Sequence, residues 1–124
     1  MKKILTLLGL FLTTAVFAQF SLEKHSGEPL VDGQTDTYGV YGYGAAELDF
    51  YVNNLSTTDQ IFMKIEFVSA VNDDGSGVEV CFGLCYSNLV IGMSYPPGTE
   101  VVTIEPGQNQ GFPGDHIVNL SDGG

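Results

Sequence analysis

The sequence predicts an all-β domain built from antiparallel strands, and three observations lead to this prediction. Apolar and polar residues alternate in short runs, as they do on a strand that buries one face. Glycine, proline, asparagine and aspartate separate these runs at intervals of roughly ten residues, a spacing typical of sandwiches and barrels. After the first 18 residues, no stretch keeps apolar residues at the 3.6-residue spacing of an amphipathic helix.

Residues 1–18 have the pattern of a secretory signal peptide. Two lysines near the start are followed by an apolar run over 4–18 that ends at the small residue Ala18. This run is shorter than the about 20 apolar residues that a helix needs to span a bilayer. We therefore expect cleavage after Ala18, export through the Sec route to the cell surface or the medium, and no membrane insertion of the mature chain.

The charge of the chain excludes several classes of partner. Fifteen acidic residues face four basic ones, which gives a net charge of −11. Removing residues 1–18 takes away two lysines and no acid, so the remaining 106 residues carry −13. Nucleic acids and anionic membrane surfaces are thereby excluded, because both require cationic side chains and the chain has no arginine.

The length predicts a single domain. With 44% hydrophobic and 11% aromatic residues, the chain can fill one modest core. We expect a loose N-terminal segment over 19–36 and a β-domain over 37–124. Seven runs are candidate strands, namely a weak one at 37–43 and clearer ones at 47–52, 60–69, 78–82, 86–93, 100–104 and 112–120.

The runs at 47–52 and 60–69 are predicted to form an antiparallel hairpin. Setting Phe50 opposite Met63 places the apolar residues of both runs on one face. A slip by one residue would mix the faces, so the pattern favours this register. The intervening residues 53–59 have the composition of a turn.

Cys81 and Cys85 are predicted to form a disulfide. In an extended strand, their Cα atoms would lie about 13 Å apart, far beyond the 4.4–6.8 Å that a disulfide spans. A bond therefore requires the chain to reverse, and Gly83 between them gives the backbone that freedom. The oxidising exported compartment favours the bond. The weaker alternatives are free thiols and a metal site, for which His25 and His116 are the further nitrogen ligands in the chain.

The tract VEVCFGLCY at 78–86 resembles the CxxxC hairpin of secreted β-sandwich modules of the Bacteroidota. The flanking tracts YVNNLSTT at 51–58, SYP at 94–96 and VVTIEPGQ at 101–108 have the order and spacing found in those modules. The resemblance extends over 40–120. It implies an immunoglobulin-like antiparallel β-sandwich of about seven strands, of a type often found ahead of a type IX secretion sorting domain, and it implies no catalytic residues.

Members of that family usually continue with a further hairpin. Here the sequence ends with the turn-like residues 121–124, so we expect the last hairpin to be missing. The sandwich would then have an open edge, which can pair with a strand from a partner or from a second copy of the chain.

Two groups of residues are candidates for ligand binding. Tyr38, Tyr41 and Tyr43 lie in three Tyr-Gly steps, and Tyr41 and Tyr43 are expected to share a strand face. Exposed tyrosines stack on sugars or dock proteins, although packing over small neighbours explains the same pattern and is the interpretation we favour. Asp73 and Asp74 offer carboxylates to Ca²⁺, the one cofactor the sequence leaves open, but the pattern is not that of an EF-hand and a solvated turn is favoured.

No enzyme is predicted. The sequence has no GxSxG nucleophile elbow, and no base, nucleophile or metal cluster has plausible spacing. The first functional hypothesis is a structural or adhesion module of a bacterial cell-surface or secreted system, with a protein or glycan as its partner. The alternatives are a module that binds carbohydrate or Ca²⁺, and a subunit that assembles by strand exchange.

Overall fold

The computed structural model describes residues 19–71, 73–109 and 115–121. In these residues the chain is an antiparallel all-β sandwich without helices, which confirms the predicted fold class. The expected signal peptide lies outside them, and none of the segments that the structure describes is a helix able to cross a membrane. The strands are β1 (Phe20–Glu23), β2 (Pro29–Leu30), β3 (Glu47–Asp49), β4 (Tyr51–Asn54), β5 (Ile61–Met63), β6 (Ile65–Glu66), β7 (Val78–Phe82), β8 (Leu84–Tyr86), β9 (Ser94–Tyr95), β10 (Val102–Ile104) and β11 (His116–Asn119).

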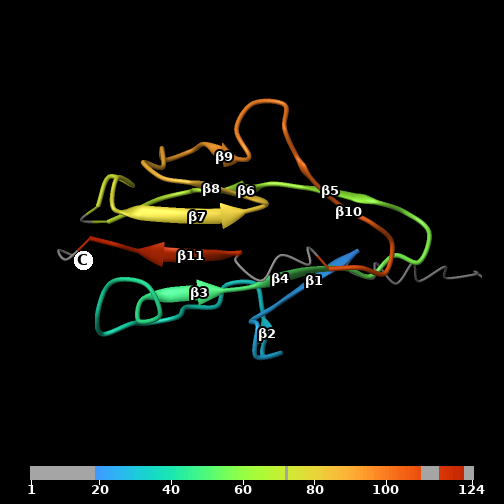
Figure 1. Ribbon diagram of the computed structural model, residues 1–124, viewed down its shortest axis with the longest axis horizontal. Helices are drawn as coiled ribbons and strands as arrows, with labels where there is room; N and C mark the ends of the chain where they lie inside the picture. Colours follow the sequence, from blue (N-terminus) through green and yellow to red (C-terminus); the bar gives the residue numbers. More distant parts are fainter. Residues whose placement is uncertain (1–18, 72, 110–114, 122–124) are drawn as a thin grey trace, which may run out of the picture.

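The largest sheet has the strand order β3-β11-β7-β8, and all of its pairs are antiparallel. Figure 1 shows β11, in red, between β3 and β7, so a strand near the end of the chain separates two strands from its middle. The strand predicted at 78–82 is confirmed as β7. Val80 and Phe82 point into the core, where they are 2% and 1% exposed, as the alternation of the sequence indicates.

Residues 47–54 form one strand that passes from one sheet to another. Its first part, β3, pairs with β11, whereas its second part, β4, pairs with β1 in the sheet β2-β1-β4. The change occurs at Phe50, whose amide donates a hydrogen bond to the carbonyl of Asp115 (3.2 Å). Residues 61–66 change partner in the same way, with β5 pairing with β10 and β6 with β9.

The predicted hairpin between 47–52 and 60–69 is therefore wrong. Met63 lies opposite Val102 and not opposite Phe50. The apolar faces were identified correctly, since Phe50 and Ile61 are both buried in one core cluster. The two runs face each other across the core instead of lying side by side in one sheet. Alternation along a strand specifies which of its faces is buried, but not which strand is its neighbour.

The filled core, as we call it, joins the two layers of the sandwich. It consists of Phe50, Val52, Ile61, Phe82, Val102 and Ile104. The rings of Phe50 and Phe82 lie 6.0 Å apart. Phe82 of the large sheet shares this cluster with residues of β5 and β10, so the large sheet packs directly on the β5–β10 pair. A smaller cluster of Val80, Leu89 and Tyr95 extends this core toward β9.

The expectation of a loose segment over 19–36 is corrected for residues 20–30. β1 and β2 lie there, and Leu22 of β1 pairs with Val52 and packs against the filled core. The sequence does not predict these strands because they are too short to show repeated alternation.

Two of the candidate strands are also wrong. The segment 37–43 forms bends and turns, because Gly42 has a left-handed backbone (φ 97°) that a regular strand does not accommodate. The run 86–93 ends as a strand at Tyr86, and Asn88 (φ 53°) then begins a turn. Of the run at 112–120, residues 116–119 form β11, and residues 112–114 fall outside the described residues.

Candidate functional site

The Cys81–Cys85 disulfide pins the hairpin of β7 and β8. The two residues lie directly opposite each other, with their Cα atoms 3.9 Å apart. Gly83 reverses the chain between them with a φ of 75°, as the sequence predicted. The amide of Gly83 donates a hydrogen bond to the carboxylate of Asp115 (3.1 Å), which ties the turn to the start of β11.

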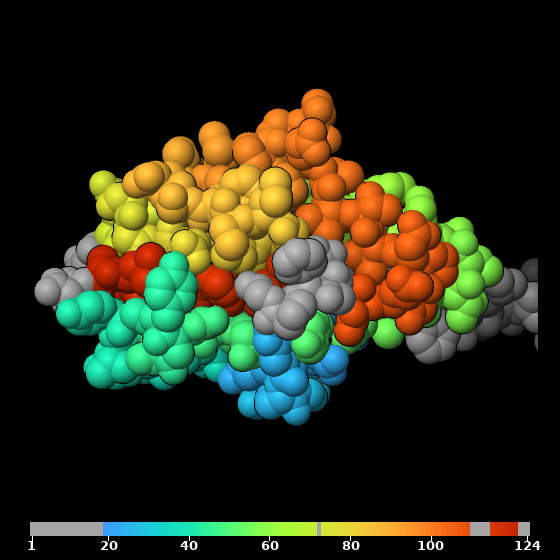
Figure 2. Space-filling view, in the orientation of Figure 1, coloured from blue at the N-terminus to red at the C-terminus, as the bar shows by residue number. Residues whose placement is uncertain are grey.

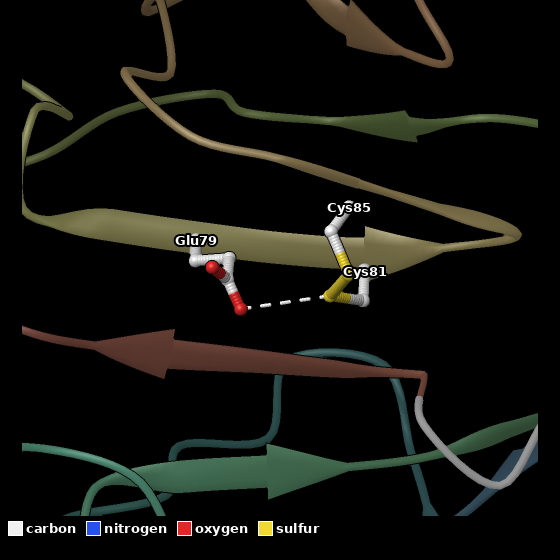
Figure 3. A group of neighbouring side chains, drawn as sticks. All are labelled: Glu79, Cys81 and Cys85. Atoms are coloured by element: carbon white, nitrogen blue, oxygen red, sulfur yellow. Dashed lines mark hydrogen bonds between the residues drawn. A yellow bond between two sulfur atoms is a disulfide. The ribbon is translucent and has the colours of Figure 1, made fainter.

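Glu79 lies beside this disulfide on the outer face of the sheet. Figure 3 shows Glu79 and Cys81 projecting from the same side of β7, with the carboxylate directed at the sulfur of Cys81 (3.6 Å). Together with Cys85 they bring three atoms of metal-binding type within 4.8 Å of one another. The two sulfurs are bonded to each other, so the oxidised hairpin presents no thiolate to a metal ion.

Tyr43 also lies on this outer face. Its hydroxyl donates a hydrogen bond to Glu79 (3.0 Å), and this bond is the main reason why the pKa of the Tyr43 phenol is raised. The ring of His116 lies 2.9 Å from Glu79 through Nε2 and 3.5 Å from Glu47 through Nδ1. In Figure 2 the segment before β3, in cyan to green, lies against the red strand β11. These polar groups bond to one another on the outer face of the sheet.

A cavity of about 690 Å³ opens at one end of the sandwich, and we call it the end cavity. Its walls come from the segments 34–41 and 67–71, from Asp73 and from strands of the large sheet. The apolar lining residues are Val40, Ala46, Leu48, Phe67, Ala70, Val71, Val78 and Ile117. The polar ones are Gln34, Asp36, Thr37, Tyr38, Tyr41, Ser69, Asp73, Asn119 and Ser121, with Gly39 completing the lining.

The end cavity brings together some of the residues singled out in the sequence and leaves others apart. Tyr38 (40% exposed), Tyr41 (55%) and Asp73 line it. Tyr43 and Asp74 do not. The expectation that Tyr41 and Tyr43 share a face is wrong, because the left-handed Gly42 between them interrupts the alternation.

Asp36 is the main residue of the cavity that the sequence did not reveal. The ammonium of Lys24, at the end of β1, donates a hydrogen bond to it (3.0 Å), as does the side-chain amide of Gln34 (3.0 Å). The bond from Lys24 is the main cause of the lowered pKa of Asp36. Burial raises the pKa of Tyr38, and the negative charge of Asp36 raises it further.

Asp73 reaches the cavity from a tight turn. Its Oδ1 accepts a hydrogen bond from the amide of Gly75 (2.6 Å), and Asp74 accepts one from the amide of Ser76 (2.9 Å). Gly75 is required here, since its φ is 94° and a Cβ would collide with the carbonyl of Leu89. The two carboxylates thus stabilise their own turn, and Ca²⁺ binding stays a prediction.

No protein-family model, no curated protein and no solved structure matches the chain. The resemblance to secreted Bacteroidota modules therefore depends on the sequence motifs and stays a prediction.

Proposed function

We propose that the protein is a non-catalytic, exported β-sandwich that acts as an adhesion module of a bacterial cell-surface or secreted system and binds a glycan in the end cavity. The observation that carries this proposal is the placement of two exposed tyrosines, Tyr38 and Tyr41, on the wall of an open cavity of about 690 Å³. Binding pockets for small molecules have volumes of about 300–1,000 Å³ and combine apolar walls with a few polar groups.

The chemistry of the lining supports a sugar as the ligand. Tyrosine faces pack on the C–H faces of sugar rings, and the hydroxyls of Thr37, Ser69 and Ser121 lie around the same cavity and match sugar hydroxyls. Leu48 and Ile117 in the lining offer apolar surface to the C–H groups of a sugar ring.

Binding without cleavage is supported by Asp36, one of the carboxylates of the lining. A glycosidase keeps one carboxyl protonated as its general acid, and such a group has a raised pKa. The pKa of Asp36 is lowered by Lys24, which is the opposite arrangement.

A glycan array tests the proposal. We expect the wild type to bind a set of glycans, and Tyr41→Ala to weaken that binding about five- to tenfold by removing one stacking face. Tyr43→Ala is the matched control, because Tyr43 is equally exposed (60%) but lies on the outer face of the sheet. Equal losses in the two variants, or no loss in Tyr41→Ala, contradict the proposal; thermal unfolding of each variant checks its fold.

Self-assembly by strand addition is a second candidate function. In the described residues, β8 is an outer strand of the large sheet, and Leu84 on it is 71% exposed. An exposed, uncharged edge of this kind accepts a further strand. Size-exclusion chromatography at two protein concentrations is expected to show a concentration-dependent oligomer, and a strict monomer contradicts this candidate.

A further inference from the structure

The electrostatics of the end cavity narrow the class of glycan. Among its described lining residues, the charged side chains are the carboxylates of Asp36 and Asp73, and no lysine or histidine is present. The chain has no arginine, and its net charge is −11. Lys64 lies elsewhere, with its ammonium bonded to the carbonyls of Pro96 and Gly98. The ammonium of Lys24 lies next to the lining but is already paired with Asp36, so an acidic sugar would meet repulsion from the uncompensated carboxylate of Asp73.

The two carboxylates differ in their partners. Asp36 already forms an ion pair with Lys24 at 3.0 Å, so its charge is largely compensated. Asp73 accepts a backbone hydrogen bond from Gly75, and the structure shows no ion pair to it from the described lysines and histidines. Asp73 is half-buried at the cavity wall, where an opposite charge is less screened than on an open surface.

We infer that the end cavity prefers an amino sugar, that is, a sugar unit that carries a free ammonium group. This inference rests on the proposed glycan binding and names its ligand class. The ring stacks on Tyr38 or Tyr41, and the ammonium pairs with the carboxylate of Asp73. The same tyrosine faces attract a nearby cation, which adds to the preference.

Calorimetric titration of the protein lacking residues 1–18 tests the inference at about pH 6, where the amine is charged. The probes are a glucosamine oligosaccharide, the same oligosaccharide with N-acetylated amines, and a glucuronate oligosaccharide. We expect the free amine to bind about tenfold more tightly than the acetylated form, and the acidic sugar not to bind. Salt at about 1 M should reduce the tenfold preference, because the ammonium–carboxylate attraction is screened.

Asp73→Asn and Asp74→Asn form a matched pair of variants. Both remove one negative charge from the same turn, and asparagine keeps the acceptor that holds the turn amide. Asp73→Asn should abolish the preference for the free amine, whereas Asp74→Asn should retain it, because Asp74 does not line the cavity. Equal loss in both variants overturns the assignment to Asp73.

The outcomes separate the inference from the proposed function. Equal affinity for the free and acetylated oligosaccharides overturns the inference and leaves glycan binding intact. No binding of any glycan overturns the proposed function as well. If ethanolamine, an amine without a sugar ring, binds as tightly as the amino sugar, recognition of a sugar is overturned. These comparisons use the wild type, so they hold even if a variant fails to fold.

Discussion

The two ends of the sandwich differ in how their interior is filled. At one end, side chains from both layers close around Phe82 and Ile104, which are 1% and 2% exposed. At the other end, Leu48, Val78 and Ile117 face a cavity of about 690 Å³. Protein interiors normally leave few voids larger than a water molecule.

The strands of the large sheet are of similar composition at both ends. β7 directs Val78 toward the cavity and Phe82 into the filled core, and the strand from Glu47 does the same with Leu48 and Phe50. The difference lies in what covers them. The β5–β10 pair covers the filled core, whereas the segments 34–41 and 67–71, which contain no strand, surround the cavity. The end cavity, which we propose as the binding site, thus arises where the covering layer loses its regular strands.

The largest difference in stability between the two ends is expected when a phenylalanine ring is removed. Phe82→Ala should lower the free energy of unfolding by about 3–5 kcal/mol, because the ring is fully enclosed. Phe67→Ala, the matched change at the cavity wall, should lower it by about 1–2 kcal/mol, since part of that ring already faces open space. Urea denaturation measures both values, and equal losses would show that the two ends are packed alike.

Replacing valine by phenylalanine should lower stability at the closed end and leave it nearly unchanged at the open end. Val52→Phe overfills the closed core and should lower stability by about 1–3 kcal/mol. Val78→Phe extends into the cavity and should change stability by less than about 0.5 kcal/mol while blocking the ligand. Thermal unfolding and glycan binding check this pair. A Val78→Phe variant that is destabilised, or that binds glycans as the wild type does, would contradict the placement of Val78 at an open cavity.

The disulfide should contribute modestly and only near the hairpin. Replacing Cys81 and Cys85 together by alanine should lower stability by about 2 kcal/mol, because the loop that the bond closes is very short. Glycan binding at the end cavity should not change. Titration of the unfolded, unreduced wild type should detect no thiol, and two titratable thiols would refute the bond.

The smallest effect is expected for the ion pair that holds one wall of the cavity. Lys24→Met should lower Tm at pH 7 by at most about 4 °C, because both side chains, 22% and 23% exposed, still reach solvent, which screens the pair. Since the pKa of Asp36 is lowered in the folded protein, its contribution is present at neutral pH and is lost as pH falls through that lowered pKa. The Tm values of wild type and variant should therefore converge well below about pH 3.9, the usual pKa of aspartate. A gap that persists in acid contradicts the pairing.

Local features of the fold were predictable from the sequence. Alternation identified the buried faces of residues 47–52 and 78–82, and the spacing of Cys81 and Cys85 required the reversal at Gly83 that the structure contains. Strand neighbours were not predictable, because β11 reaches β3 and β7 across long stretches of chain that no local pattern relates.

The candidate site illustrates the same limit. Tyr41 and Tyr43 look equivalent in the sequence, yet one lines the end cavity and the other bonds to Glu79 on the outer face. One backbone angle at Gly42 separates them. Asp73 joins Tyr41 at the cavity only after two segments far apart in the sequence meet, which depends on the whole fold.

The strand over residues 47–54 has a mechanical consequence. Because β3 pairs with β11 and β4 pairs with β1, a single continuous backbone belongs to two sheets. These two sheets cannot separate unless the hydrogen bonds on one side of Phe50 break together, since the covalent chain transmits the load between them. A module that holds a ligand at one end and is pulled at the other would carry that tension through this strand.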